Sequence, residues 1–538
     1  MVTDMGGRDP LGLSRVAFLI TDYLLPGIIT TTDRARYYSF YCWALWHIQK
    51  EEQPKKYQDF VNAFRRREAT MALATLIANQ STSPVGVEAT RKYFERGTET
   101  GSFDCDFKVL PSNALGGYGQ YYGGSIYKLR LSHTPEDGID HVTEGIAEEL
   151  ARSFQSALEG TPYLKKHLFT EKEISGTDLR KSSGFLTLDA LGETFAADER
   201  QKLTEIFFGL GHPNIDEETV LRRQTLTHLL HIISEYERAG CELTAERRFG
   251  LDEYLLYPMY YGCLWPEKNQ IISYKAPKEL SFCTGLWRQF CLHQFLSQAL
   301  EDLLCSVLEA AGAQVLGLTV EEIAADLTQN DFFSYLSSAT GKKCHTPKTL
   351  LSALGMSDVP DESFSIQSQR ELSPKHKLSE ARILYMEVDS PQSQAARAVL
   401  LLAVVYGKWV GIANDIGYRH IAQRAGTQLW AGNLLYTLDD WLSSTLTWEQ
   451  ALQSMIEQFV INKHDQTVYE KRRLDSSWLS RTEGKVFKEQ DYEPVWRASR
   501  FLNCVKIMAD LGLLRIDTNK ALTMTGRGRK FLEKLTHQ

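Results

Sequence analysis

Two arginines stand at the start of a predicted helix near the amino terminus, within LLPGIITTTDRARYYSFYCWALWHI (residues 24–48). Arg34 and Arg36 fall in the first turn, where the helix dipole is already positive and a cation is unfavourable. Two cations there predict an anionic partner. It is either a phosphate, which helix amino ends and arginine forks both bind, or a carboxylate such as Asp22 or Asp33. The sequence leaves both alternatives open.

A second group of cations lies near the carboxyl end. From about residue 464 onward, basic residues outnumber acidic ones by roughly five, whereas the whole chain has a formal charge of −8. Nucleic-acid binding must therefore come from a local patch and not from the net charge. We expect DNA as the nucleic-acid partner, and the residues expected to contact it are Arg34, Arg36, Arg515, Lys520, Arg527, Arg529 and Lys530.

Glycines alternate with tyrosines in LGGYGQYYGG (residues 115–124). The stretch has no GxGxxG between a strand and a helix and lacks the Lys-Ser/Thr ending of a P-loop, so neither route to nucleotide binding is supported. Tyrosine rings spaced by glycines can stack on bases, as in single-strand binders. Tyr118, Tyr121 and Tyr122 are the candidates for stacking. Close backbone packing against the amino-terminal helices is the alternative.

The sequence contains no recognised catalytic motif. His228, His231 and Glu235 have a spacing that suits metal ligands on one helix, but no HExxH follows and ordinary histidines are expected. There is no GxSxG, zinc ribbon or kinase signature. We predict no catalytic residue, no metal and no cofactor. A metal-dependent nuclease with dispersed acidic ligands, such as Glu235, Asp252 and Glu253, stays open as an alternative, and so does the question of whether the chain is an enzyme.

These side chains must be positioned mainly by helices. Apolar residues recur at a spacing of three to four over residues 11–25, which predicts a helix. Pro26 and Gly27 break it, and the threonines before Asp33 can cap the next helix, expected over residues 33–50. Residues 101–131 lose the helical period and predict an irregular or short-strand insertion. The fold class is therefore mainly α and multi-domain.

Four regions follow from these patterns. Residues 393–412 are apolar on most faces and predict a helix at the centre of a bundle. The predicted domains are an amino-terminal helical region with the Gly/Tyr-rich insertion (1–140), a helical domain (141–250), a central helical bundle (251–463) and a carboxyl-terminal domain (464–538).

The carboxyl-terminal domain has the clearest pattern. Within residues 496–535, an apolar helix ends at Gly512, two short strands flank a polar turn at residues 518–520, and a closing helix follows Gly526. This order of helix, hairpin and helix resembles winged-helix domains. The resemblance implies either nucleic-acid binding or an architectural, protein–protein role, and the basic residues around the predicted wing favour nucleic acid.

The cysteine content and the absence of long apolar runs favour a cytoplasmic protein over a secreted or membrane protein. Nine cysteines are scattered without CxxC pairs and mostly in apolar surroundings, which is typical of buried, reduced thiols in a cytosolic protein. No apolar run approaches the ~18 residues of a membrane span, and the first residues lack the order of a signal peptide. We expect a cytoplasmic protein with no membrane partner. The sequence does not indicate an oligomeric state.

The pattern PGIxTxTxRARYYSFxxW (residues 26–43) resembles the amino-terminal signature of an uncharacterised bacterial family, and GYGQYYxG (residues 117–124) is similar to a later motif of it. Such proteins tend to be encoded among phage-defence and restriction genes. The resemblance implies a role beside a helicase, nuclease or ATPase and transfers no catalytic residue. The predicted function is thus a non-catalytic nucleic-acid-binding or scaffold subunit of a bacterial antiviral system. The alternatives are a metal-dependent nuclease and a pure protein–protein adaptor.

Overall fold

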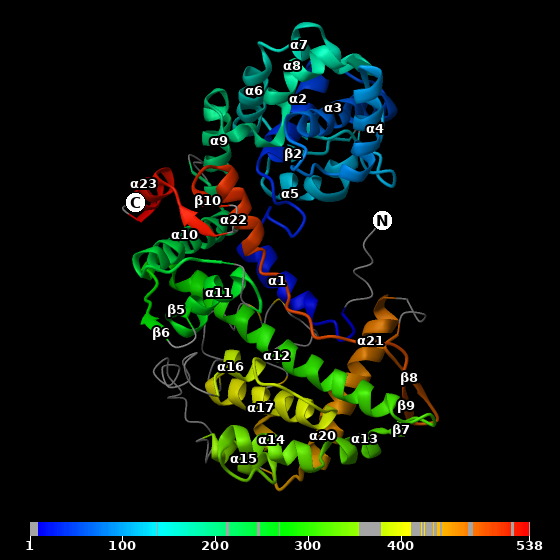
Figure 1. The fold of residues 1–538 in the computed structure, drawn as a ribbon, viewed down its shortest axis with the longest axis vertical. Coiled ribbons are helices and arrows are strands. Elements are labelled where there is room, and N and C mark those ends of the chain that lie inside the picture. The colour runs from blue at the N-terminus through cyan, green and yellow to red at the C-terminus, as the bar shows by residue number, and fades with distance from the viewer. Residues whose placement is uncertain are drawn as a thin grey trace. The chain divides into compact units, whose positions relative to one another are not determined.

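The structure is a computed structural model, and it divides the chain into two compact units (Figure 1). Unit 1 comprises Met1–Thr21 and Glu246–Ser499, and unit 2 comprises Asp22–Ala245 and Arg500–Gln538. The boundary falls within helix α1 (Ser14–Leu24). The residues described are 9–136, 138–210, 215–244, 248–267, 270–354, 378–409, 421, 424, 434, 438–441, 444–471, 477–517 and 521–536.

Unit 2 is built around two long helices. Helix α6 (Ile146–Leu158) packs on α2 (Arg36–Glu51), and α8 (Gly176–Leu186) packs on α3 (Tyr57–Ala78) (Figure 1). Helix α2 carries aromatic residues on all sides and is buried along most of its length. The other elements in this part of unit 2 are α4 (Val87–Thr100), β1 (Ser102–Asp104), the π-helical turn η2 (Tyr118–Tyr122), α5 (Gly123–Lys128), β2 (Ser132–His133), β3 (His141–Val142), α7 (Pro162–Lys165), η3 (Leu168–Thr170), β4 (Glu173–Ser175), η4 (Leu188–Gly192) and η5 (Thr194–Ala196).

The carboxyl-terminal residues complete unit 2. Strands β10 (Leu514–Ile516) and β11 (Leu522–Met524) form an antiparallel hairpin, and the amide of Leu522 also donates to the carbonyl of Leu243 at 3.0 Å, which adds a short antiparallel bridge. Asp216 caps the long helix before that bridge by accepting from the amide of Thr219. The elements are α9 (Ala197–Phe208), α10 (Glu217–Arg238), α22 (Phe501–Asp510), β10 (Leu514–Ile516), β11 (Leu522–Met524) and α23 (Gly526–Thr536).

Unit 1 is organised by α12 (Ser281–Gly312), a helix of 32 residues that is buried nearly all round. Because such a helix must be covered on every side, α11 (Leu251–Tyr261) and α17 (Pro391–Trp409) pack along it (Figure 1). The side chains of α17 between Ala395 and Tyr406 are buried, as expected for the helix predicted at the centre of a bundle.

Shorter elements surround these helices. Capping boxes at Thr319 and Thr447 begin two of them, because each threonine accepts from the third amide of its helix. The elements are β5 (Cys263–Glu267), β6 (Gln270–Ser273), η6 (Lys278–Leu280), β7 (Leu318–Thr319), α13 (Val320–Leu327), α14 (Asn330–Thr340), α15 (Pro347–Ala353), α16 (Glu380–Leu384), α20 (Trp448–Met455), η9 (Ile456–Ile461), α21 (Asn462–Lys471), β8 (Leu479–Thr482) and β9 (Lys485–Lys488).

The mainly helical class is confirmed, and every named sheet is small and antiparallel. The Gly/Tyr-rich insertion contains helical turns as well as short strands, because its tyrosines pack on α2 and do not pair in a ladder. The tail has the predicted order of helix, hairpin and helix, and it belongs to the same compact unit as residues 22–245. Among the described residues, no helix combines the length and apolar character that crossing a membrane requires.

Candidate functional site at the threonine–arginine turn

The turn between α1 and α2 is shaped by glycine and threonine. Gly27 has a φ of +80°, a conformation that L side chains rarely adopt, and a Cβ there would lie 2.5 Å from Cγ of Leu129. Thr32 Oγ1 accepts from the amide of Ile29 at 2.9 Å, so this threonine closes the turn and does not cap α2. The amide of Ala35, just before α2, instead donates to Asp510 at 2.9 Å.

Arg34 bridges two carboxylates. Its Nε donates to Oδ2 of Asp510 at 3.1 Å, and its Nη2 donates to Oδ1 of Asp189 at 2.8 Å and to the carbonyl of Leu188 at 3.1 Å. Burial opposes the charge, but the two carboxylates outweigh it and raise the pKa of Arg34. Burial raises the pKa of Asp510 in spite of Arg34. The guanidinium is therefore committed to groups of its own chain.

Arg36 is fully enclosed. Its side chain and that of Glu199 are both 0 % exposed, and Nε and Nη2 donate to the two carboxylate oxygens at 3.2 and 3.3 Å. Nη1 donates to the carbonyl of Thr187, Ser39 donates to Glu199 at 2.5 Å, and the guanidinium lies 4.9 Å from the ring centroid of Phe154. Every nitrogen of the guanidinium therefore has a partner within unit 2.

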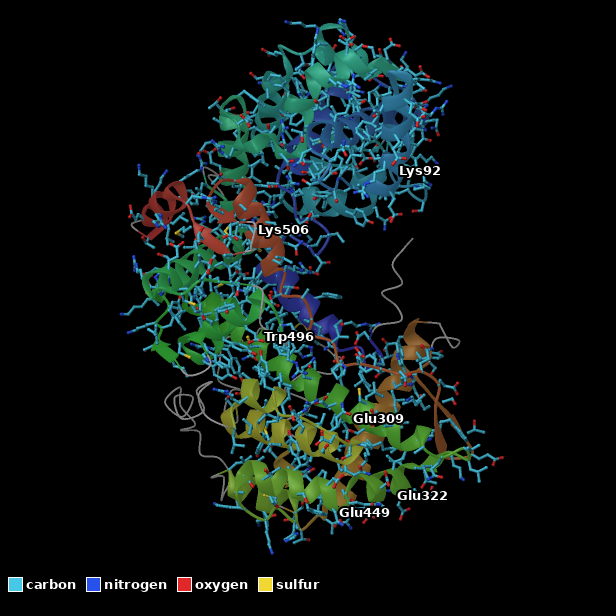
Figure 2. All side chains as sticks on the ribbon, viewed as in Figure 1. Lys92, Glu309, Glu322, Glu449, Trp496 and Lys506 are labelled. Carbon is cyan, nitrogen blue, oxygen red and sulfur yellow. The ribbon has the colours of Figure 1, made fainter. Side chains whose placement is uncertain are left out.

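Helix α22 is fastened to the same turn along its length. Arg500 contacts Asp22 at 2.5 Å and the carbonyl of Ile28 at 3.0 Å. Asn503 donates to the carbonyl of Thr30 at 3.1 Å, and Lys506, labelled in Figure 2, pairs with Asp33 at 2.7 Å. With Asp510 on Arg34, these contacts recur about once per helical turn. We call the set formed by residues 22–36, Asp189, Glu199 and α22 the clamp.

The Gly/Tyr-rich segment packs against α2. Tyr118 and Tyr122 are 2 % and 1 % exposed, whereas Tyr121 is half-buried. The ring of Tyr122 lies 4.8 Å from that of Tyr37, and the hydroxyl of Tyr118 donates to Asp140 at 2.8 Å. This geometry favours the packing interpretation over base stacking, since two of the three candidate rings have no free face.

Glu68 on α3 fixes this segment. It accepts from the hydroxyl of Tyr41 at 2.7 Å and from the amide of Gly117 at 2.9 Å. A Cβ on Gly116, whose φ is +55°, would lie 1.7 Å from the other carboxylate oxygen, so the glycine permits the close approach. Burial raises the pKa of Glu68 to about 7, although the hydrogen bonds from Tyr41, Gly117 and Tyr118 lower it. Glu68 therefore titrates near neutral pH.

The cations of the tail have mixed surroundings. Arg529 pairs with Glu237 at 2.9 Å, and Arg527 donates to Gln201 at 3.2 Å and to Thr204 at 3.4 Å. Arg515 and Lys530 are exposed. Lys520 lies outside the described residues. A cavity of about 310 Å³ lies between α10 and α23, and it is lined by Ser234, Glu237, Arg238, Arg529, Leu532 and Glu533.

The acidic residues considered for a nuclease have structural partners. Glu235 pairs with Arg238 at 2.6 Å. Asp252 accepts from Ser499 at 2.6 Å, and burial raises its pKa to about 6. Glu253 accepts from the amide of Phe249 at 3.0 Å. Within the described part of the chain, no group of three or more His, Cys, Asp or Glu side chains is arranged to hold a metal ion.

Sequence reasoning missed the partners of the arginines. Asp22 and Asp33 were the carboxylates proposed for Arg34 and Arg36, whereas the structure gives those arginines Asp189, Glu199 and Asp510 and gives Asp22 and Asp33 to α22. The partners lie between 155 and 476 residues away in sequence. No local spacing reports contacts of that range. The sequence indicated that Arg34 and Arg36 need an anionic partner, because both stand at an unfavourable helix position, but it did not indicate which residues supply that partner.

Comparison with protein-family models, with curated proteins and with solved structures gives no match for this chain. The role of the clamp must therefore be argued from its own chemistry. Among the described residues, no group of three or more His, Cys, Asp or Glu side chains is arranged there to hold a metal ion. The paired charges of the clamp bind distant parts of unit 2 to one another.

Proposed function

We propose that this chain is a non-catalytic scaffold subunit of a bacterial multi-gene antiviral system. The antiviral context is supported only by the resemblance of residues 26–43 and 117–124 to proteins of phage-defence loci. The scaffold role is supported by one observation, the neutralisation of Arg34 and Arg36 by acidic groups of unit 2. The cations that most suggested a phosphate site serve to assemble the fold instead.

The burial of Arg36 and Glu199 opposes phosphate binding at this position. A phosphate that reached Arg36 would have to displace Glu199, and both side chains are 0 % exposed. Removing one partner from a buried ion pair leaves an uncompensated charge, which typically costs about 3–5 kcal/mol. A ligand would have to supply that free energy before gaining any affinity. The residues of the signature motif therefore support a structural role.

We propose that the carboxyl-terminal residues form a winged-helix-like module together with α10, with unit 1 inserted between them in the sequence. Helix α10, the bridge at Leu243, helix α22 and the hairpin β10–β11 follow the winged-helix order, in which the first strand pairs with the hairpin. Residues 246–499 lie between the bridge and α22. Proteins that read DNA with a helix place its free face in the major groove. Here Lys506 and Asp510 of α22 pair with Asp33 and Arg34 of the clamp, which supports an architectural role.

Unit 1 offers a surface for such a role. Val315 and Leu316, in the turn after α12, are 96 % and 77 % exposed. Isolated exposed apolar residues are ordinary, but two adjacent aliphatic side chains with so little cover favour contact with another protein. Co-purification with the products of neighbouring genes should fall for Val315→Ser/Leu316→Ser. It should not change for Lys92→Ser, an exposed residue on α4.

Nucleic-acid binding is the second candidate, and it is favoured by Arg515 and Lys530, which are exposed on β10 and α23. Binding of the full chain to a labelled DNA duplex at low ionic strength separates the two candidates. Phosphate contacts would give an affinity that falls steeply with added salt. Loss of that affinity in Arg515→Ser/Lys530→Ser, with Lys92→Ser unaffected, would favour nucleic acid. No binding at low ionic strength would favour the scaffold.

Substitution is a sharper test than truncation here. Removing residues 500–538 would take away α22, whose Phe501, Cys504, Val505 and Ile507 are 0 % exposed in the core of unit 2. A truncated chain that fails to bind a ligand would therefore report misfolding. The exposed cations can be replaced without opening the core, so a change in affinity would be attributable to their charges.

A further inference from the structure

A row of polar side chains runs along the buried helix of unit 1. Gln289, His293, Ser297 and Glu301 recur every fourth residue of α12, so they lie on one ridge of the helix. They are 3 %, 2 %, 0 % and 0 % exposed. We call these four residues the α12 ridge. Buried polar side chains are unexpected on a helix that the rest of unit 1 encloses.

The ridge faces two segments of unit 1 that lack regular structure. His293 Nε2 lies 2.6 Å from the carbonyl of Leu13, near the start of α1. Glu301 accepts from the hydroxyl of Tyr492 at 2.6 Å, from the amide of Val495 at 2.9 Å and from Arg497 Nη2 at 2.5 Å. The ridge is therefore covered by residues 9–13 at one position and by residues 492–497 at another.

Four buried atoms of this region have no hydrogen-bond partner among the described residues. They are Nε2 of Gln289, Nδ1 of His293, Oγ of Ser297 and Nε of Arg497. Each belongs to a side chain that is at least nine-tenths buried. Buried polar atoms in proteins are nearly always paired with protein or with ordered water, because leaving them unpaired forfeits the hydrogen bonds they made to water when unfolded. Several such atoms on one ridge point to a common partner.

The protonation of His293 defines what that partner must offer. Burial lowers the pKa of His293 to about 4, so the ring is neutral at pH 7. Since Nε2 faces a carbonyl, it carries the hydrogen, and Nδ1 is an acceptor. Gln289 Nε2 and Arg497 Nε are donors, and the hydroxyl of Ser297 can both donate and accept. The partner must donate and accept hydrogen bonds within a short span.

We propose that the α12 ridge binds a row of buried water molecules between Gln289, His293 and Ser297. Side chains four residues apart on a helix are about 5–6 Å apart at Cβ, which leaves room for one water accepting from one side chain and donating to the next. Water needs two to four polar partners in a buried site, and the ridge supplies them. The site is distinct from the clamp and independent of the proposed scaffold role.

Water fits this site better than an ion does. The charge of Arg497 is already balanced by Glu301 at 2.5 Å and by Asp9 at 3.6 Å, so a further anion would be repelled by two carboxylates. No set of three metal-ligating side chains is found in the described part of the chain. Most of the unpartnered atoms belong to neutral groups. A neutral ligand that can both donate and accept hydrogen bonds can pair with all of them.

The test combines a high-resolution crystal structure of the full chain with oxygen-17 magnetic relaxation dispersion, which counts long-lived buried waters. We expect density within hydrogen-bonding distance of His293 Nδ1 and Ser297 Oγ. We also expect Ser297→Ala to lose the dispersion contribution of about one water. Ser306→Ala is the matched control, because Ser306 is equally buried on the same helix but donates to the carbonyl of Asp302 at 2.9 Å. It should lose no water.

A dry ridge would give the opposite results. The density would be absent, the relaxation dispersion of Ser297→Ala would match that of the parent protein, and Ser297→Ala would raise the melting temperature, because it would remove an unpaired buried hydroxyl. Any of these three results would overturn the proposal. Density too large for water would also overturn it, since that would indicate a small polar ligand instead.

Discussion

The clamp in unit 2 and the α12 ridge in unit 1 both bury polar side chains, but they satisfy them differently. In the clamp, each nitrogen of Arg36 has a partner from the chain itself. On the ridge, Gln289, His293 and Ser297 each leave an atom without one among the described residues. Burial alone therefore does not identify a binding site. A site that is closed by its own partners holds the fold together, and one with unmatched atoms has capacity for a ligand.

The largest effect should come from opening the clamp. Arg36→Met leaves Glu199 buried and unpaired, so the free energy of unfolding of unit 2 should fall by about 3–5 kcal/mol. Denaturant titration monitored by circular dichroism measures it. The double variant Arg36→Met/Glu199→Leu should recover much of the loss, because neither charge then remains. Arg529→Met breaks a pair whose arginine is 55 % exposed, and should change stability by less than about 1 kcal/mol.

A large loss of stability in Arg36→Met and a small one in Arg529→Met would show that the buried pair of the clamp holds unit 2 together. If Arg36→Met were no more destabilising than Arg529→Met, the buried pair would contribute little to the fold. The assignment of the clamp as a purely structural device would then fail, and a ligand for Arg36 would again have to be considered.

Glu68 should make the stability of unit 2 depend on pH. Burial raises its pKa from 4.5 to about 7, so the folded protein holds a proton that the unfolded chain has released in that range. The stabilisation from the neutral form is complete below pH 4.5 and is lost as the pH rises through 7. A shift of this size corresponds to about 3 kcal/mol. Thermal unfolding measured from pH 4 to 8 should show the decline.

Glu68→Gln is the control for this assignment. The amide cannot ionise and can still accept from Tyr41, so the variant should lose the decline and exceed the parent protein in stability at pH 8. An unchanged pH profile in Glu68→Gln would mean that another group of unit 2 is responsible, such as Asp510, whose pKa burial also raises.

Gly116 tests how closely the Gly/Tyr-rich segment is fitted to Glu68. Gly116→Ala places a Cβ 1.7 Å from a carboxylate oxygen at a φ of +55°, so we expect a loss of about 2 kcal/mol in unfolding free energy. Gly124→Ala in α5 meets no atom within 4 Å and should be neutral or slightly stabilising. Equal effects of the two substitutions would show that the segment can move away from α3.

Local patterns predicted much of this fold and little of the chemistry. The helical periods, the break at Pro26 and Gly27 and the terminal hairpin were visible because each depends on residues close in sequence. The pairing of Arg34 with Asp510 was not visible, since it spans 476 residues. The joining of residues 22–245 to residues 500–538 in one unit was hidden for the same reason. The four-residue spacing of the α12 ridge is present in the sequence, but the many apolar residues of the helix made the segment read only as a buried helix.

Two substitutions on α12 should distinguish a paired from an unpaired buried amide. Gln294 donates to the carbonyl of Arg497 and accepts from its amide at 3.2 Å. Gln294→Met leaves both backbone groups buried without partners and should cost about 1–3 kcal/mol. Gln289→Met removes an amide whose Nε2 has no described protein partner, and its effect should stay within about 1 kcal/mol. If both substitutions destabilised unit 1 equally, Gln289 would also be held by the protein, and the contrast between the unpaired amide of the ridge and the paired amide of Gln294 would disappear.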